Sequence, residues 1–560
     1  ENNSSKFIVA CIGTKDDINL QDLTAYLKSS LPFYMIPSKY IVLDSLPLNI
    51  NGKLDTKKLL TYVSNMPVQE EILKPTNNIE ASLVEIWEKV LKIDNIGIDQ
   101  NFFELGGDSL CAINLIYLIN LKFNVKITIQ TLFDHPTIQE IAALITENNI
   151  NSKNENCAKN ISNGYSDINN LLKNNTLDNF EPPKIQKIGN LLLFGSTGFL
   201  GIHILTNYLD NDTGIAYCII RPKNGKSPKS RLLDKLHFYF GTKYDSLFEK
   251  RIHILKGDIV MDNFGLSNND YSLLDNNVDT VINCAAIVKH FGKRQNFENI
   301  NIKGTSNIIK FCQNSNKRLL HCSTLSLTMD LSKHPELNSH MLSEQDFYFE
   351  QNLDNLYVST KFEAERLVYE AISKGLNACC LRIGNISNRY SDGVFQENFK
   401  ENSILMKLES FVEIGYIPDY LLDLTLDFTP VDLCSDAILK IAHTDIKYST
   451  FHIFNKNIIT MKNLIEIFNK LSINIKAIDE TSFNKIFEEI RQDVSKQNML
   501  TGIIQDWIKD KEFKYYYNNK NDSRFTEKYL NSIDFFWPEL DIKYFEKCIN
   551  HFKKLGYFGG

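Results

Sequence analysis

The chain has 560 residues, 43% hydrophobic and 23% charged, which suggests roughly three to five folded units and excludes a wholly disordered protein. With a net charge of −7, the chain lacks the excess of basic residues that is typical of a nucleic-acid-binding protein. No apolar run is long enough to predict a membrane span. The eleven cysteines form no C-x-x-C pair, so we expect no metal site and reduced thiols in a cytoplasmic protein.

The first block, residues 1–66, contains the string PFYMIPSKYIVLDSLPLNINGKLDTKKLL. Its N-G-K-L-D segment predicts a turn, because Asn-Gly adopts positive φ readily, and Lys53 would then be a solvated charge. The opening residues ENNSSKFIVA show neither an initiator Met nor a signal-peptide pattern, so we expect the chain to begin inside a larger polypeptide. Pro67 and Pro75 indicate a break before the next block.

Residues 77–150 predict a small helical bundle. IEASLVEIWEKVLKI and LCAINLIYLIN have apolar residues at helical spacing, and NFFELGGDSL places a Gly-Gly turn before the second helix. Asp108 and Ser109 stand at the start of that helix, where both residue types are ordinary caps. An exposed hydroxyl at a helix start is also accessible to a modifying enzyme, and the helix N-terminus favours a phosphate.

The string FFELGGDSL, followed by L-F-x-H-P-T, resembles the carrier (thiolation) domains of nonribosomal peptide synthetases. The resemblance implies a 4'-phosphopantetheine arm on Ser109, added by a separate phosphopantetheinyl transferase. L-P-x-Y-M-I-P-S together with N-G-K-L-D resembles the C-terminal subdomain of adenylation enzymes, in which the lysine matching Lys53 contacts the acyl-adenylate. The large subdomain with the phosphate-binding loop is absent from this chain, so we expect no adenylation activity.

An Asn-rich stretch without apolar periodicity, residues 151–186, predicts a linker. Residues 187–560 then alternate apolar strands (LLLFG, AYCII, HILKG, TVINCAA, RLLHCS, ACCLRIG) with helical stretches, which indicates a parallel, doubly wound α/β sheet. We expect this Rossmann-type core to span about 187–390 and 425–455. Residues of about 391–424 and 456–560 should form a mostly helical substrate subdomain, and the aromatic side chains of Phe395, Phe411 and Tyr416 could line its pocket or fill its core.

A dinucleotide-binding turn is predicted where GNLLLFGSTGFLGIHIL places a strand before the glycines and a helix after them. Gly195 would permit the tight turn, Gly198 the approach of the pyrophosphate and Gly201 the packing of helix on strand. The cofactor-binding residues expected here are Gly195, Ser196, Thr197, Gly198, Phe199, Leu200 and Gly201.

The residue after the second strand indicates which cofactor is bound. NAD-selective sites usually carry Asp or Glu there, whereas this chain has Arg221, with Arg231 ten residues further on. A guanidinium binds a 2'-phosphate bidentately, so the sequence favours NADPH. Either arginine could instead be a solvated charge, and Asp258, expected near the adenine, could be a strand-end turn residue.

The pair Tyr357 and Lys361, at i and i+4, would share one face of a helix. Tyr239/Lys243 and Tyr516/Lys520 have the same spacing, but Tyr357 follows a strand-end hydroxyl cluster, RLLHCSTLS, and precedes a helix and a strand. Free tyrosine has a pKa of about 10, too high for efficient acid/base work at neutral pH, so we expect the ammonium of Lys361 and a cationic nicotinamide to lower the pKa of Tyr357.

The strings LLLFGSTGFLG, VINCAAIVKHFG, YVSTKFEAE, LRIGNISNRYSDG and DFTPVDLCSDAI resemble the extended short-chain dehydrogenase/reductase family, in particular the terminal thioester-reductase domains of peptide synthetases. The resemblance implies catalytic Thr324, Tyr357 and Lys361, with Tyr357 and Lys361 also at the cofactor. Ser323 and Ser326 stay open as alternatives for the hydroxyl. Asn301 would lock the active-site helix, hold a water or simply pack, and Lys289 and His290 would touch substrate or lie in a solvated loop.

The expected function is NADPH-dependent release of a phosphopantetheine-bound peptidyl or aminoacyl thioester as an aldehyde, with further reduction to an alcohol left open. Upstream synthetase modules (the adenylation core and condensation domains) would supply the thioester. The alternatives are a release domain that cyclises the chain without reducing it, a carrier and docking module whose reductase-like half is inactive, and a sugar-nucleotide epimerase with the same cofactor fold.

Overall fold

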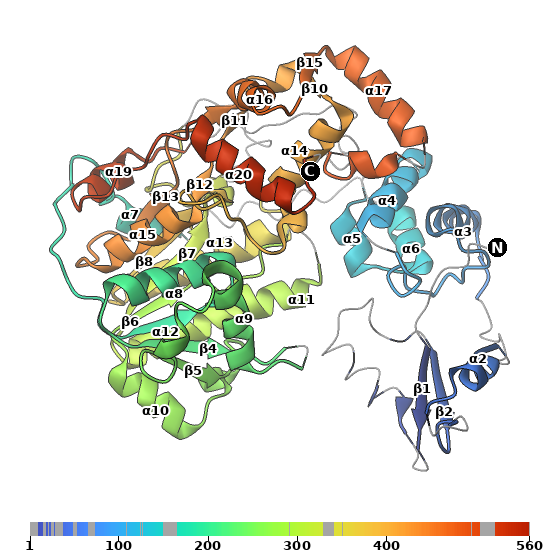
Figure 1. Cartoon of the computed structure of the whole chain (residues 1–560), viewed down its shortest axis with the longest axis horizontal. Helices are drawn as coiled ribbons and strands as arrows, with labels where there is room; N and C mark the ends of the chain where they lie inside the picture. The colour runs from blue at the N-terminus through green and yellow to red at the C-terminus, as the bar shows by residue number, and fades with distance from the viewer. Residues whose placement is uncertain are drawn as a thin grey trace. The chain divides into compact units, whose positions relative to one another are not determined.

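The computed structural model of the chain describes residues 9–14, 18–20, 22–23, 27, 37, 39–48, 53–64, 73–107, 109–123, 125, 127–148, 165–223, 225–289, 292–328, 341–349, 351–493, 496–503 and 521–558. The chain divides into two compact units, residues 1–156 and 157–560 (Figure 1). Each unit has its own apolar core, and each is described by itself.

The N-terminal part of the first unit is a small α+β element, as predicted. Strands β1 (Val9–Gly13) and β2 (Lys39–Leu43) pair in parallel, and helix α2 (Thr56–Ser64) follows. Leu48 and Leu54 form an antiparallel bridge on either side of the expected turn, whose Asn51 and Gly52 lie outside the described residues. Lys53 is exposed.

The predicted helical bundle is confirmed. It comprises α3 (Asn78–Leu91), α4 (Ser109–Phe123), α5 (Ile129–Asp134) and α6 (Ile138–Asn148). Asn77 caps α3 by accepting a hydrogen bond from the Glu80 amide, and Thr128 caps α5 in the same way. The apolar faces meet around Trp87 and Phe102, whose rings contact edge to face at 5.9 Å.

The Gly-Gly turn before α4 requires both glycines for different reasons. Gly106 has a backbone φ of +96°, in the left-handed region that residues other than glycine rarely adopt. At Gly107, a Cβ atom would lie 2.3 Å from the ring of Phe102, which is fully buried. The turn therefore closes tightly over the bundle core immediately before Ser109.

A seven-stranded parallel sheet forms the centre of the second unit. Its order is β13-β8-β7-β6-β3-β4-β5, with strands β3 (Leu191–Phe194), β4 (Ala216–Ile220), β5 (Ile252–Lys256), β6 (Thr280–Asn283), β7 (Arg318–Thr324), β8 (Ala378–Ile383) and β13 (Thr450–Ile453). The strand order reverses between β3 and β6, and such a switch point is where doubly wound sheets bind ligands. The six predicted strands are all present.

Helices cover both faces of this sheet (Figure 1). Alternate residues of β3 point to opposite cores: Leu191 and Leu193 to one, Leu192 and Phe194 to the other. The first core is completed by α8 (Phe199–Asn211), α9 (Pro228–Phe240) and α15 (Val431–Ala442). The second is completed by α7 (Ser166–Leu172), α10 (Asn268–Asn277), α12 (Gly304–Asn314) and α13 (Leu356–Ser373).

The predicted linker, residues 151–186, is too long at its C-terminal end. Helix α7 packs against α13, and the ring of Tyr165 contacts Phe347 and Phe362 edge to face. Asn175, almost fully buried, donates a hydrogen bond to the Thr450 carbonyl of β13. The aromatic ring of Tyr165 meets large buried partners, so residues 165–186 belong to the core of the second unit.

The rest of the second unit is mainly helical, as expected, with short strand pairs. It comprises β9 (Ile386–Ser387), β12 (Thr429–Pro430), α14 (Ser403–Ile414), β10 (Tyr416–Pro418), β15 (Lys476–Ile478), β11 (Thr425–Leu426), β14 (Ile459–Thr460), α16 (Met461–Lys470), α17 (Glu480–Gln492), α19 (Arg524–Asn531) and α20 (Ile542–Lys554). One boundary needs correction. Helix α19, placed by the sequence in the substrate subdomain, packs instead on β13 and α15, where Tyr529 contacts Phe451 at 4.7 Å.

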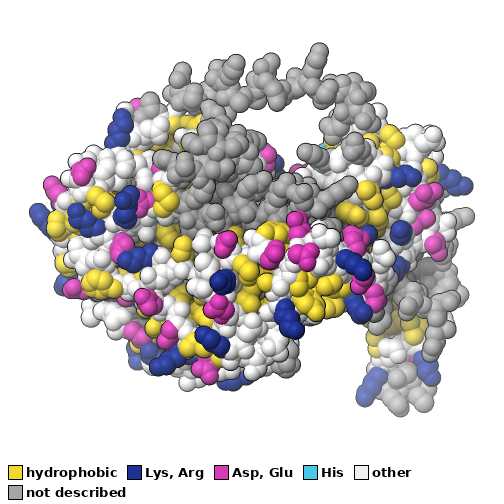
Figure 2. Space-filling view, turned by 90° about the horizontal axis from the view of Figure 1, so that it is seen from above, with side chains coloured by type: hydrophobic (Ala, Val, Ile, Leu, Met, Phe, Trp, Pro, Cys, Tyr) yellow, Lys and Arg dark blue, Asp and Glu magenta, His cyan; other side chains and the backbone are white. Residues whose placement is uncertain are grey.

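On the face shown in Figure 2, basic and acidic side chains of the described residues are interspersed rather than segregated. Within the described parts of the chain, no helix has both the length and the apolar character needed to cross a bilayer.

Candidate active site

The predicted dinucleotide turn lies between β3 and α8, at the switch point of the sheet. Gly195 has φ +81, and a Cβ there would lie 2.7 Å from the carbonyl carbon of Cys284, just after β6. At Gly201, a Cβ would lie 2.2 Å from the Gly195 carbonyl oxygen. Gly198 is the N-cap of α8, where a Cβ would meet only that oxygen, at 3.2 Å. The turn is therefore a close-packed cradle at the N-terminus of a 13-residue helix, which suits a pyrophosphate.

Two arginines and an aspartate meet beside this turn. Arg231 donates hydrogen bonds to the Arg221 carbonyl and, at 3.5 Å, to the Thr197 hydroxyl. Arg221 Nη1 lies 3.6 Å from Asp258 Oδ2, and about half of the Arg221 side chain is exposed. Asp258 also accepts a hydrogen bond from the Val260 amide. This contact agrees with the alternative that Asp258 is a turn residue at the end of the strand. Arg231 thus fastens the end of β4 to the glycine turn, and the guanidinium of Arg221 stays accessible to a ligand.

The hydroxyls of Thr324 and Tyr357 meet at the carboxyl end of β7, because the Tyr357 phenol is hydrogen-bonded to Thr324. Asn355 starts α13 by accepting hydrogen bonds from the amides of Tyr357 and Val358, at 3.0 and 3.1 Å, so the tyrosine lies in the first helical turn. Burial raises the pKa of Tyr357, while the hydrogen bond with Thr324 acts in the opposite direction. The phenol is therefore protonated at neutral pH and is equipped to donate.

Lys361 follows Tyr357 on α13, and β7 holds its side chain. Its ammonium is buried and donates to the carbonyl oxygen of Cys322 at 2.6 Å, with His321 Nε2 3.4 Å away. Burial lowers the pKa of Lys361. The expected lowering of the Tyr357 pKa by this ammonium is thus wrong for the chain alone, in which burial dominates and the lysine is directed to the backbone of β7.

Of the three candidate hydroxyls, the geometry favours Thr324. Ser323 donates its hydroxyl proton at 2.7 Å to the buried carboxylate of Glu365, so this proton is already engaged. Thr324 Oγ1 also accepts the amide of Ser326, which fixes its position at the strand end. The hydrogen bond between Thr324 and Tyr357 places two hydroxyl groups side by side, and both can donate to a developing oxyanion.

A buried ionic network that the sequence analysis missed lies behind these residues. Arg382 of β8 contacts Glu365 of α13 at 2.7 Å, with 1% and 0% of their side chains exposed. Glu365 also accepts hydrogen bonds from Ser323 and Tyr369. The signal was present: Arg382 is a charge inside an apolar strand and needs a partner. Tyr357, Lys361, Glu365 and Tyr369 repeat every four residues along one face of α13.

Asn301 links helix α13 to the loop after β6, which corresponds to the first role considered for it, locking the active-site helix. It accepts a hydrogen bond from the Ile287 amide at 2.8 Å and donates to the Thr360 hydroxyl at 3.0 Å. It lies in a π-helical turn, Glu298–Lys303, and such turns often mark functional positions. Lys289 is exposed, and His290 lies outside the described residues.

Ser109, the residue predicted to carry the arm, is described only in its backbone. Helix α4 begins at Ser109, but the side chain of this serine and the whole of Asp108 lie outside the described residues. Of the three aromatics expected in a pocket, Phe395 lines one, whereas Phe411 is buried against Phe483 and Tyr416 starts β10.

Comparison with known proteins decides the family. A family model described as "Male sterility protein", an NAD-binding family, matches residues 193–438, and a "Phosphopantetheine attachment site" model matches residues 81–145. The solved thiolation-reductase di-domain of an archaeal nonribosomal peptide synthetase is 30% identical and has a TM-score of 0.73, with 87% of this chain and 100% of that one covered. This chain belongs to the same thiolation-reductase family.

Longer relatives agree. A linear gramicidin synthase protein of Brevibacillus parabrevis is 27% identical over 98% of this chain, and L-2-aminoadipate reductase of Saccharomyces cerevisiae is 26% identical over 74% of it. The chain covers 11% and 32% of these proteins, so it corresponds to a part of each. The predicted carrier and Rossmann-type reductase domains are confirmed, whereas the roles of individual residues stay predictions.

Proposed function

We propose that the chain releases an acyl or peptidyl group from the phosphopantetheine arm of Ser109 by reducing its thioester with NADPH to an aldehyde. The observation that supports this best is the hydrogen-bonded pair of Thr324 and Tyr357, at the strand edge that also carries the dinucleotide turn. Upstream synthetase modules would deliver the thioester, and a phosphopantetheinyl transferase would add the arm, in a cytoplasmic setting. We propose the division into 1–66, 77–150 and a reductase starting near residue 165.

The residues of the turn fit a dinucleotide. Gly195 and Gly201 leave room where side chains would collide, Gly198 caps α8, and Arg221 with Arg231 offers charge for a 2'-phosphate. When bound, NADPH supplies the hydride for the thioester carbonyl.

The protein's own groups would then act on the carbonyl oxygen. Thr324 and Tyr357 donate hydrogen bonds where negative charge develops, and Tyr357 gives up its proton to form the hemithioacetal. The raised pKa of Tyr357 keeps that proton in place until the oxyanion forms. Lys361, tied to the Cys322 carbonyl, holds α13 against β7 and places a positive charge beneath the site. Collapse of the hemithioacetal breaks the C–S bond and returns the pantetheine thiol.

The test is NADPH oxidation by the chain carrying an acylated arm. Tyr357→Phe should reduce turnover by about 100-fold or more, the scale of a lost general acid. Tyr239→Phe is the matched control: Tyr239 also precedes a lysine by four residues, but it lies in α9 and its hydroxyl accepts the Glu397 amide. Ser109→Ala should abolish turnover of the carrier-bound substrate and leave a free pantetheine thioester reducible. Release without NADPH oxidation would point to cyclisation instead.

A further inference from the structure

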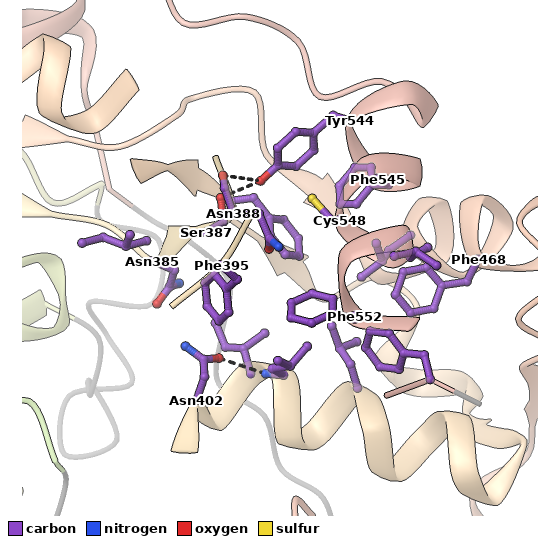
Figure 3. A pocket seen from close by; sticks show the side chains of 18 of the residues that line it. Asn385, Ser387, Asn388, Phe395, Asn402, Phe468, Tyr544, Phe545, Cys548 and Phe552 are labelled. Atoms are coloured by element: carbon purple, nitrogen blue, oxygen red, sulfur yellow. Dashed lines mark hydrogen bonds between the residues drawn. The ribbon is translucent and has the colours of Figure 1, made fainter. Parts of the chain in front are cut away.

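A hollow lies in the second unit, between β9 and helices α14, α16 and α20 (Figure 3). Its empty space is about 700 Å³, a figure that includes the mouth open to solvent. In Figure 3, Asn385 lies on one side of the hollow and Phe468 on the other, with Phe552 between them. Six phenylalanines line it: Phe395, Phe428, Phe468, Phe545, Phe552 and Phe558.

The polar groups in the wall already bond within the protein. Ser387 and Tyr544 share a hydrogen bond of 2.8 Å, and Asn388 donates to the Gly393 carbonyl at 2.7 Å. Asn402 accepts the Leu405 amide at 3.0 Å and so caps α14. A polar ligand group placed among the rings would lose its hydrogen bonds to water without gaining equivalent partners, which is unfavourable.

The wall contains one carboxyl group, Asp427, and it too is engaged. Asp427 accepts hydrogen bonds from the amide of Asn385, at 2.7 Å, and from its side-chain nitrogen. Burial raises the pKa of Asp427, against the effect of these hydrogen bonds. The carboxyl therefore serves the turn after β8, and the six phenylalanines offer apolar contact.

The register of the sheet places this hollow beside the proposed catalytic pair. Thr324 is the register partner of Ile383 in the neighbouring strand β8, and Asn385 of the pocket wall is two residues further on. Asn385 therefore lies in the turn that leaves β8, at the same carboxyl edge of the sheet that carries Thr324. A carbonyl held by Thr324 and Tyr357 would have its acyl substituent within reach of the hollow.

We propose that this hollow receives the acyl side of the thioester and selects a neutral apolar side chain, aromatic or branched, on the residue next to the carbonyl. The inference rests on the proposed reductase function. It adds a specificity determinant made by α14 and α20 that is separate from the catalytic groups.

The experiment compares N-acetyl-phenylalanyl, leucyl, alanyl, aspartyl and lysyl pantetheine thioesters as substrates of the full chain, with kcat/KM measured by NADPH oxidation. The phenylalanyl and leucyl thioesters should exceed the alanyl one by about 10- to 200-fold, the discrimination expected of an apolar pocket. Leu408→Trp, which adds a ring from α14, should bring that ratio close to one. Leu273→Trp adds the same ring at an exposed position of α10 and should leave it unchanged.

A fluorescence titration with NADPH shows whether each variant is folded. If Leu408→Trp loses NADPH binding, Phe552→Ala takes its place, and it should lower the preference for leucyl over alanyl by widening the opposite wall. Equal kcat/KM for all five thioesters, or a preference for the aspartyl or lysyl one, overturns the inference and leaves the reductase function standing. Failure to reduce any thioester contradicts the reductase function itself.

Discussion

Replacing Glu365 by glutamine should destabilise the reductase unit more than any exposed charge change on the same helix. Glu365 and Arg382 are both within 1% of full burial and lie 2.7 Å apart. Ser323 and Tyr369 donate to the same carboxylate, so the arginine and both hydroxyls depend on its negative charge and acceptor geometry. Removing one partner of such a pair leaves the other charge buried without compensation, at a cost of about 3–5 kcal/mol.

The same helix supplies a matched control. Glu363→Gln removes a carboxylate that pairs with Arg366, but these side chains are 38% and 26% exposed, and Arg366 also contacts Glu370. Exposed pairs of this kind contribute less than about 1 kcal/mol. The contrast between the two glutamine variants isolates burial from the chemical change itself.

The measurement is urea denaturation of the full chain followed by far-UV circular dichroism, in which residues 157–560, the larger unit, dominate the signal. The free energy of unfolding should fall several-fold more for Glu365→Gln than for Glu363→Gln. Combining Glu365→Met with Arg382→Met should recover part of the loss, since no uncompensated charge remains. Equal, small losses in the free energy of unfolding for both glutamine variants would refute the reasoning that this ion pair stabilises the packing of α13 on β8.

Arg221→Ala should weaken NADPH binding by about 10- to 100-fold, the scale of a charge-assisted hydrogen bond, and NADH binding little, as measured by fluorescence titration; equal losses contradict a 2'-phosphate role. Gly201→Ala, whose Cβ would meet the Gly195 carbonyl at 2.2 Å, should abolish cofactor binding, whereas Gly198→Ala, with 3.2 Å available, should retain a folded chain by circular dichroism. Burial raises the pKa of Glu344 from 4.5 to about 7, so the unfolded chain releases this proton first and stability falls as pH rises from about 4.5 to about 7. Glu344→Gln should therefore gain stability over wild type at pH 8, by up to about 3 kcal/mol, and show little gain at pH 4, as followed by urea denaturation.

Local pattern was enough to predict much of the fold. Continuous apolar runs identified six buried parallel strands, and the glycine spacing located the turn before α8. The seventh strand, β13, was not predicted, because it has only four residues and His452 interrupts its apolar run. Helix α7 escaped for a similar reason: its stretch is rich in asparagine, and it is held by partners such as Phe362 and Thr450 that are distant in sequence.

The site was predicted in its residue types but not in its electrostatics. Spacing and context identified Tyr357 and Lys361, but not the backbone carbonyl of Cys322 that holds the lysine, since a carbonyl leaves no mark in a sequence. The sequence offers no physical reason to prefer Thr324 over Ser323; the structure supplies one, because the hydroxyl of Ser323 donates to Glu365. The phenylalanine-lined hollow depends on α14, α16 and α20 meeting in space, which local periodicity cannot show.

The packing of α19 on β13 protects the outermost strand of the sheet. The amide of His452 donates to the Thr526 hydroxyl at 2.8 Å, and its ring nitrogen lies 2.8 Å from the Asp522 carbonyl. An edge strand that is left uncovered can pair with a strand of another chain, and such pairing leads to aggregation. Helix α19 follows β13 by some seventy residues in the sequence. A polypeptide truncated or stalled before Asn521 would therefore expose an edge strand that α19 covers in the full chain.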